Sequence, residues 1–96
     1  MYVVIVDFVI KPEHAAAFAK AVSENARAST EREAACRQFD VCVSPDDPSR
    51  LFLYEIYNER AGFEAHLASA HYKSFDQLVQ PWIADKKVRF LQRIEA

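Results

Sequence analysis

Glycine is nearly absent from this sequence of 96 residues, in which Gly62 is the only one. Loops that cradle phosphate groups need several glycines, because their backbone must approach the ligand closely and adopt conformations that other residues disfavour. The sequence therefore contains neither a dinucleotide-binding motif nor a P-loop. We expect a protein without a tightly bound nucleotide cofactor or flavin.

Cysteine is also scarce, since Cys36 and Cys42 are the only two. On one extended strand they would lie about 20 Å apart, which is beyond the reach of a disulfide. No spacing of cysteine and histidine matches a structural zinc site, and His66 and His71 are separated by an expected break between helices. We interpret both cysteines as reduced packing residues and expect no bound metal.

The sequence has no excess of basic residues, and its formal net charge is -2. Domains held by nucleic-acid phosphates normally carry a clustered basic surface, so a nucleic-acid partner is not expected. The apolar run from Tyr2 to Ile10 is too short to span a bilayer as a helix. It also lacks the flanking features of a signal peptide, which predicts a cytoplasmic protein with no membrane association.

The first half of the chain predicts a strand followed by a long helix. Valine, isoleucine and aromatic residues dominate Tyr2 to Ile10, and Pro12 ends this strand. An amphipathic helix is expected from Pro12 to about Glu33, because apolar and small residues recur on one helical stripe. These residues are Ala15, Phe18, Val22, Ala26 and Ser29.

A hairpin is expected next, with strands at 36–43 and 51–57 joined by a turn at 44–48. In the first of these strands, alternation assigns residues to two opposite faces. Phe39, Val41 and Val43 form one face, and Cys36, Gln38, Asp40 and Cys42 form the other.

The last third predicts a helix in two pieces and a final strand. Apolar residues recur at helical spacing from about Glu59, which predicts a helix with Asn58 as its N-terminal cap. The pattern is interrupted at 69–71. Alternation returns at 86–94, which predicts the fourth strand. The order β-α-β-β-α-β indicates one α+β domain over residues 1–96, of ferredoxin-like topology. Both helices should cover one face of a four-stranded antiparallel sheet.

Two of the expected strands are apolar on both faces, apart from one acidic residue in each. Asp7 is the exception in 2–10, and Glu55 is the exception in 51–57. Because the helices cover only one face, the other face needs a second sheet, which a two-fold copy of the chain would supply. We therefore expect a homodimer. The alternative is a monomer in which these residues only reflect β-propensity.

Three polar residues are candidates for catalysis. An unpaired carboxylate at Glu55 would be costly in an apolar strand, so it either faces a cavity or pairs with Arg37 or Arg93. His66 follows Phe63 at helical spacing and is a candidate general base or a structural histidine. Because its helix should pack over the sheet, we expect His66 to form a hydrogen bond with Glu55. The Asn25 amide lies on or beside the buried helical stripe, where it either holds a substrate oxygen or binds nearby backbone.

Further residues are candidates for substrate binding. Those at the helix break, His71, Tyr72 and Lys73, are expected to form a polar mouth. Trp82 either walls a pocket or packs in the core.

Several runs resemble the antibiotic biosynthesis monooxygenase family over nearly the whole chain. They are Phe39-Asp40-Val41, Asp47-Pro48, Phe52-Leu53-Tyr54-Glu55-Ile56-Tyr57, Phe63-Glu64-Ala65-His66 and Ser69-Ala70-His71-Tyr72. The most specific feature is the aromatic strand with Glu55, followed eleven residues later by His66. Asn25 also matches a polar position on the family's first helix, and His71-Tyr72-Lys73 resembles the branch that processes phosphorylated autoinducer-2 products.

The resemblance implies a dimeric α/β barrel with a pocket between sheet and helices, where Phe39 and Tyr54 would also contact a small-molecule substrate. It implies a monooxygenase that oxidises a quinol-like, aromatic or polyketide-like compound with molecular oxygen, without metal or flavin. Haem cleavage is not expected, because Asp7 stands where haem-degrading members have asparagine. An isomerase or degrading enzyme of a phosphorylated dicarbonyl, and a non-catalytic ligand-binding dimer, remain alternatives.

Overall fold

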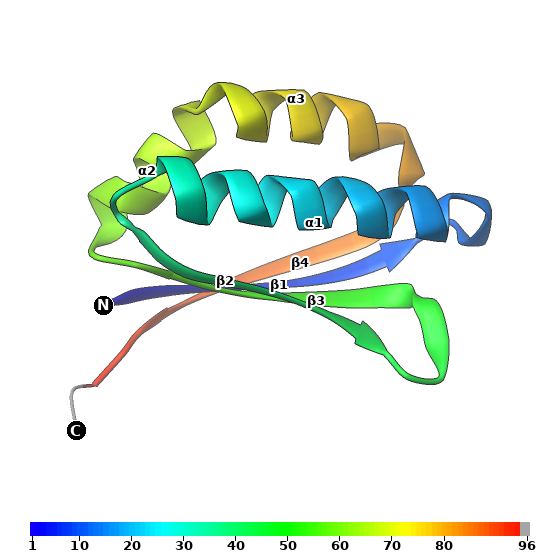
Figure 1. Cartoon of the computed structure of the whole chain (residues 1–96). Helices are drawn as coiled ribbons and strands as arrows, with labels where there is room; N and C mark the ends of the chain where they lie inside the picture. Colours follow the sequence, from blue (N-terminus) through cyan, green and yellow to red (C-terminus); the bar gives the residue numbers. More distant parts are fainter. Residues whose placement is uncertain (95–96) are drawn as a thin grey trace.

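A computed structural model describes residues 1–94 and arranges them in two layers (Figure 1). One layer is a four-stranded antiparallel sheet of order β2-β3-β1-β4, and the helices form the other. The strands are β1 Tyr2–Ile10, β2 Cys36–Ser44, β3 Asp47–Tyr57 and β4 Ile83–Gln92. The helices are η1 Pro12–His14, α1 Ala15–Arg32, α2 Arg60–Ala68, α3 Ala70–Val79 and η2 Gln80–Trp82. The predicted α+β ferredoxin-like fold is therefore confirmed.

The strands of the hairpin are longer than the sequence indicates. The turn contains only Pro45 and Asp46, so β3 begins at Asp47 rather than at Leu51. Pro48 is tolerated because the pairing of β3 with β1 ends at Arg50, beyond which no β1 residue needs its missing N–H. At the other edge of the sheet, β4 begins three residues before the expected start.

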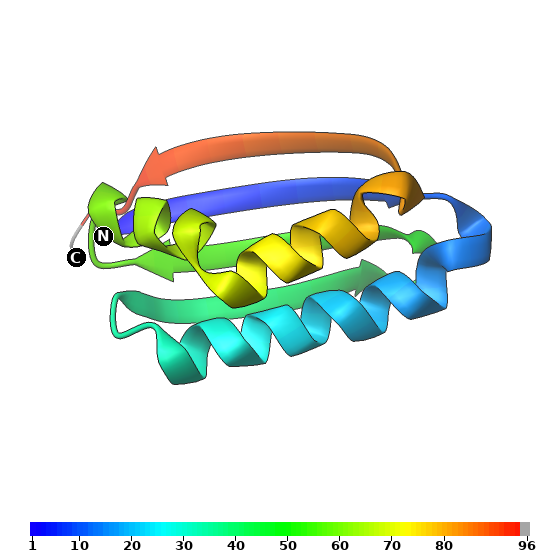
Figure 2. The same ribbon diagram turned by 90° about the horizontal axis from the view of Figure 1, so that it is seen from above.

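The helices lie side by side on one face of the sheet. The predicted stripe of α1 is buried throughout, and it packs towards the strands as expected. The break between α2 and α3 falls at Ser69, whose extended backbone ends α2 and whose hydroxyl accepts a hydrogen bond from the Tyr72 N–H at 3.3 Å. In Figure 2, β4 lies outside the area that α1 and α3 cover. Val88 and Phe90 consequently remain exposed, although they face the helix side of the sheet.

Three local expectations are wrong. A register shift between Cys36 and Gln38 turns Cys36 into the helix-side core, whereas strict alternation would direct it outward. Cys42 is exposed rather than a packing residue. Asn58 does not cap α2, because its side-chain oxygen instead accepts a hydrogen bond from Arg37 Nη1 at 3.1 Å.

The two faces of the sheet both carry apolar residues, as the strand patterns predict. The helix-side face contributes to the main core, which includes Phe18 and Val22 of α1. The outer face carries a second cluster, which consists of Val3, Ile5 and Ile56 with the partly buried Met1, Phe52 and Tyr54 packed against them. Within residues 1–94, no helix is both long enough and apolar enough to cross a membrane.

Candidate functional site

A cavity of about 240 Å³ lies between the helix-side face of the sheet and the helices. Its mouth is beside β4, where the exposed Val88 and Phe90 contribute to the lining. The other lining residues are Val4, Val6, Phe8, Asn25, Phe39, Leu53, Glu55, Phe63, His66, Leu67, Tyr72, Phe75 and Lys86. An apolar cavity with a few convergent polar groups is the usual form of a small-molecule site, so we place the candidate site here.

Glu55 is the buried acid of this cavity. It lies on β3 between Val4 of β1 and Phe39 of β2, and only 3% of it is exposed. Its Oε1 accepts a hydrogen bond from the Tyr57 hydroxyl at 2.6 Å. Of the two alternatives for Glu55, the structure shows the position facing a cavity, and among residues 1–94 it shows no ion pair with Arg37 or Arg93. Tyr57 is two residues further along the strand, which places both side chains on the same face.

The surroundings of Glu55 favour its protonated form. Burial raises the pKa of this carboxyl to about 7, although the Tyr57 hydrogen bond and the Lys86 charge both act in the opposite direction. Burial and the nearby Glu55 carboxylate raise the pKa of Tyr57 well above its ordinary value, so Tyr57 remains a neutral donor. Near neutral pH, Glu55 is therefore able to give or accept a proton.

His66 is almost completely buried in α2, and one of its ring nitrogens is anchored. Its Nδ1 lies 2.9 Å from Glu33 Oε2 and 3.4 Å from the Ser29 hydroxyl. Burial lowers the pKa of His66, although Glu33 acts in the opposite direction. A neutral ring that donates Nδ1–H to Glu33 leaves Nε2 as an acceptor, and within residues 1–94 Nε2 makes no hydrogen bond.

The position of His66 depends on close packing around α2. Its ring lies 4.9 Å from the ring of Tyr72 and 6.2 Å from the ring of Phe63, measured between centroids. A Cβ atom added at Gly62 would lie only 2.8 Å from the Cβ of Ala35. The single glycine therefore allows α2 to approach the segment after α1, which brings His66 within reach of Glu33.

The predicted hydrogen bond between Glu55 and His66 is not formed. Both side chains line the cavity, but Glu55 binds Tyr57 and His66 binds Glu33. The sequence correctly places the two residues on a strand and on the helix above it. It does not reveal that His66 has a closer partner, because Glu33 is 33 positions away from His66.

Asn25 also lines the cavity, and its side chain is almost fully buried. Its Oδ1 is buried without a hydrogen-bond partner among the described residues, while its backbone carbonyl accepts a hydrogen bond from Ser29 Oγ at 2.7 Å. An unsatisfied buried amide oxygen is costly, and a ligand that donates a hydrogen bond would remove that cost.

The predicted substrate-binding residues divide into two groups. Phe39 and Tyr72 line the cavity. Tyr54 does not, because alternation along β3 directs it to the outer face, where it packs against the apolar cluster. Lys73 is exposed on α3, and Trp82 stacks on His14 with ring centroids 5.2 Å apart.

His71, the remaining predicted substrate-binding residue, lies outside the cavity. Its Nε2 is 2.5 Å from Glu33 Oε2, and its side chain lines a separate groove between α1 and α3. The expected polar mouth at the helix break is therefore not part of the cavity, apart from Tyr72. The reason is that a helix directs successive side chains to different sides.

Two residues of the site were missed in the sequence. The proximity of Tyr57 to Glu55 could have been predicted, because a residue two positions from Glu55 on a strand must share its face. The role of Glu33 could not, because Glu33 follows the end of α1 and approaches the histidines only through the packing of the helices. The Cys36 thiol adds no nucleophile near this site, because burial raises its pKa to about 12.

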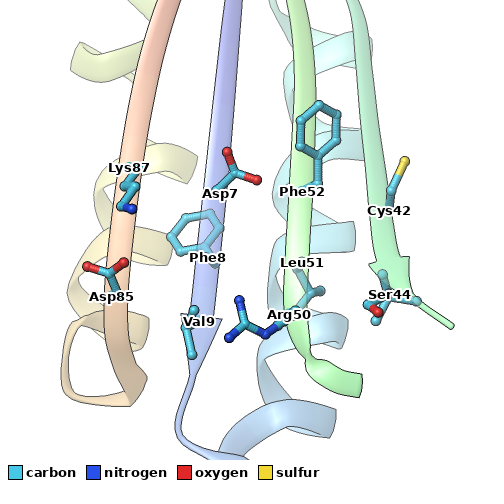
Figure 3. Close-up of a pocket in the computed structure, with 11 residues that line it drawn as sticks. Asp7, Phe8, Val9, Cys42, Ser44, Arg50, Leu51, Phe52, Asp85 and Lys87 are labelled. Atoms are coloured by element: carbon cyan, nitrogen blue, oxygen red, sulfur yellow. The ribbon is translucent and has the colours of Figure 1, made fainter. Parts of the chain in front are cut away.

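A larger hollow of about 560 Å³ lies on the outer face of the sheet (Figure 3). Figure 3 shows Asp7, Phe52 and Cys42 on neighbouring strands, with the helices behind the sheet. Its charged residues are exposed, and Arg50 pairs at 3.5 Å with Asp47. Because none of its acidic or basic groups is buried, we assign the chemistry to the smaller cavity despite the difference in volume.

Comparison with known proteins gives a consistent result. Residues 1–78 match the family model described as antibiotic biosynthesis monooxygenase. A solved structure from Nitrosomonas europaea, provisionally described as an antibiotic biosynthesis monooxygenase, is 35% identical, with a TM-score of 0.93. The match covers 99% of this chain and 100% of that one. No curated protein matches the sequence.

Two further solved structures share the fold at lower identity. One from Bacteroides thetaiotaomicron is 17% identical with a TM-score of 0.92, and the match covers 98% of this chain and 90% of that one. One from Deinococcus radiodurans is 21% identical with a TM-score of 0.89, and the match covers 100% of this chain and 95% of that one. Both carry the same provisional description.

Proposed function

Since this chain belongs to the antibiotic biosynthesis monooxygenase family, we propose that it oxidises a small, electron-rich aromatic compound with molecular oxygen, without a metal or flavin. The observation that carries the proposal is the apolar cavity that joins His66, Glu55 and Asn25. Its volume of about 240 Å³ lies below the usual range of roughly 300–1,000 Å³ for ligand pockets. This favours a phenol or quinol with one or two rings.

His66 is the general base in this proposal. With Nδ1–H directed at Glu33, the free Nε2 accepts the proton of a substrate hydroxyl, and Glu33 stabilises the resulting imidazolium. Phe39, Phe63 and Tyr72 exclude water around the ring. The proton transfer therefore produces a phenolate in apolar surroundings, where its electrons are more available.

Glu55 and Asn25 assist at other points of the substrate. The Asn25 Oδ1 accepts a hydrogen bond from a second substrate hydroxyl, which fixes the ring in the cavity. Glu55, held by Tyr57, serves as the proton donor for the reduced oxygen species. Its pKa of about 7 suits a group that must be protonated for part of the time at neutral pH.

The substrate supplies every electron that the reaction needs. The phenolate transfers one electron to dioxygen, and the two radicals combine to form a carbon–oxygen bond. Loss of water then leaves a carbonyl, so that one oxygen atom enters the product and the other leaves as water. The protein contributes the base, the hydrogen bonds and the apolar cavity.

The isomerase of a phosphorylated dicarbonyl receives less support. That alternative needs Lys73 and an arginine to bind a phosphate beside His66, but Lys73 is exposed on α3 and does not line this cavity. Among the described residues that line the cavity, Lys86 is the only lysine or arginine. An apolar cavity with one cation at its mouth suits an aromatic ring better than a phosphate.

We also infer that the protein acts as a homodimer through the outer face of the sheet. Val3, Ile5 and Ile56 are buried there, but Phe52 and Tyr54 remain partly exposed beside them, and Leu91 of β4 is exposed on the same face. No helix of the described chain covers this face (Figure 1). A second sheet would remove Phe52, Tyr54 and Leu91 from water, and burial of apolar area stabilises association.

The proposed reaction is tested by measuring oxygen consumption with a panel of phenols and quinols, alongside product analysis after reaction in ¹⁸O₂. We expect catalysed consumption with at least one small member and one labelled oxygen atom in its product. Inorganic phosphate should not inhibit. A protein that binds these compounds without consuming oxygen would instead support the ligand-binding alternative.

A further inference from the structure

Three potential metal-ligating groups meet beside the cavity. Glu33 follows the end of α1, His66 lies in the last turn of α2, and His71 lies in the first turn of α3. Their ligand atoms, a carboxylate oxygen and two imidazole nitrogens, all lie within 4.8 Å of one another. Residues from three separate segments converge because the break at Ser69 turns α3 back over the end of α1.

The carboxylate at the centre of this cluster is incompletely satisfied. Glu33 Oε2 contacts both histidines, but Oε1 is buried without a hydrogen-bond partner among residues 1–94. Within the same residues, no lysine or arginine forms an ion pair with Glu33. A buried carboxylate with a free oxygen and no fixed cation is a group that a bound cation would stabilise.

We propose that Glu33, His66 and His71 bind a divalent transition-metal cation of the Zn²⁺ class. Two imidazoles and one carboxylate form a donor set that these ions accept, and the remaining position would be open to water. Ligands around such an ion lie roughly 3.3 Å apart when each is about 2.0–2.1 Å from it. Glu33 Oε2 is 2.9 Å from His66 Nδ1 and 2.5 Å from His71 Nε2. These contacts would open by about 0.4 and 0.8 Å around the ion, and the two histidine nitrogens already lie within 4.8 Å of each other.

The cation would change the hydrogen bonding of His66 towards the cavity. A cation on Nδ1 replaces the proton there, and the neutral ring then carries its proton on Nε2. Nε2 would become a donor and lose its capacity as a base. This consequence rests on the proposed function and makes the site inhibitory, whereas the binding of the ion does not depend on any activity.

The binding is tested with metal alone, by titrating the chelator-treated full-length protein with Zn²⁺ in a calorimeter and with Co²⁺ in a visible spectrometer. We expect one ion per chain and ligand-field absorption from Co²⁺. His71→Ala and Glu33→Gln should each weaken binding at least about tenfold. His14→Ala is the matched control, because the third histidine of the chain lies in η1 beside Trp82, and it should bind like the wild type.

Far-ultraviolet circular dichroism checks that each variant is folded, and His71→Ala removes the more exposed of the two histidines. Absence of saturable one-to-one binding in the wild type overturns the proposal. Binding that persists unchanged in either variant, or that is lost in His14→Ala, also overturns it. Because no substrate is present, these outcomes are independent of whether the protein oxidises phenols.

Discussion

Asp7 of β1 and Glu55 of β3 make an instructive comparison, because each is the acidic exception in a strand of otherwise apolar residues. Asp7 lies on the outer face, exposed to solvent and paired in register with Phe52 and Lys87. Glu55 lies on the helix side, buried and bonded to Tyr57. The difference arises only from the position of each residue along its strand, since alternate side chains of a strand point to opposite faces of the sheet.

The comparison separates two roles of the sheet. The helix-side face has a cavity, buried titratable groups and hydrogen bonds between side chains, which are the features of a chemical site. The outer face has the partly exposed apolar side chains of Phe52 and Tyr54, and none of the charged residues that line its hollow is buried, which is compatible with an interface. Four substitutions test this division.

Phe52→Asp should abolish the dimer. The side chain is only partly buried on the outer face of a single chain, so the isolated domain tolerates a charge there. In a sheet-to-sheet interface, the same charge would be buried without a partner and would cost several kcal/mol. Sedimentation velocity at micromolar concentration should show a folded monomer.

Leu78→Asp is the control for this change, because it places the same charge on the exposed surface of α3. This variant should sediment as the wild type does. A dimer that survives Phe52→Asp would show that the outer face is not the interface.

His66→Gln should lower the turnover rate on the order of 10²-fold or more, which is the usual contribution of a general base. Glutamine remains polar and can still donate to Glu33, but it cannot accept a proton from the substrate. The measurement is kcat with the most active compound of the phenol and quinol panel.

The control for His66→Gln is His14→Gln, which should leave kcat unchanged because His14 lies outside the cavity. If His66→Gln lowers the melting temperature while the rate per folded molecule is retained, His66 has a structural role and the general-base assignment is wrong.

Glu55→Gln should change how stability depends on pH. In the folded protein the pKa of Glu55 is about 7, against an ordinary value of 4.5. The folded state therefore binds more protons between these values, and stability falls as pH rises from 4.5 to 7. The variant lacks this loss, so its stability relative to the wild type should rise by roughly 3 kcal/mol between pH 4.5 and 8.

The relative stability is obtained from urea unfolding of both proteins at a fixed protein concentration, so that dimerisation affects them equally. Glutamine can still accept the Tyr57 hydrogen bond, which keeps the local packing. Parallel pH profiles for variant and wild type would contradict the burial of an ionisable carboxyl at this position.

Asp7→Asn should have the smallest effect, and we expect an unchanged kcat. Asp7 lines the outer hollow rather than the cavity, so removing its charge leaves His66, Glu55 and Asn25 in place. A loss of rate comparable to that of His66→Gln would mean that the outer face takes part in the reaction, and the division between the two faces would fail.

Patterns of neighbouring residues were sufficient for most of the fold. The helical stripe of α1, the break at Ser69 and the two-sided apolar strands could all be predicted, because they reflect spacing within one element. The errors occur where a strand departs from strict alternation, as at Cys36, or where a polar side chain finds a distant partner, as at Asn58.

The candidate site was also predictable only in part, because some of its contacts join residues that are distant along the chain. Asn25, Phe39, Glu55, His66 and Tyr72 were identified, and all five line the cavity. Tyr54 was expected to contact a substrate in the pocket. It directly precedes Glu55 on the strand, however, so its side chain points to the opposite face. The orientation of Tyr54 was therefore available from spacing and was overlooked, whereas the position of His71 outside the cavity depends on how α3 packs.

Local patterns in the sequence are enough to predict the order of the elements, the faces of the strands and the presence of polar residues at buried positions, since each depends on residues close along the chain. The contacts of Glu33 with both His66 and His71 become visible only in the folded structure. Those pairings depend on how closely α1, α2 and α3 pack, which is set by side-chain volumes such as that of Gly62 against Ala35. Contacts between residues more than 30 positions apart carry no periodic signal in the sequence.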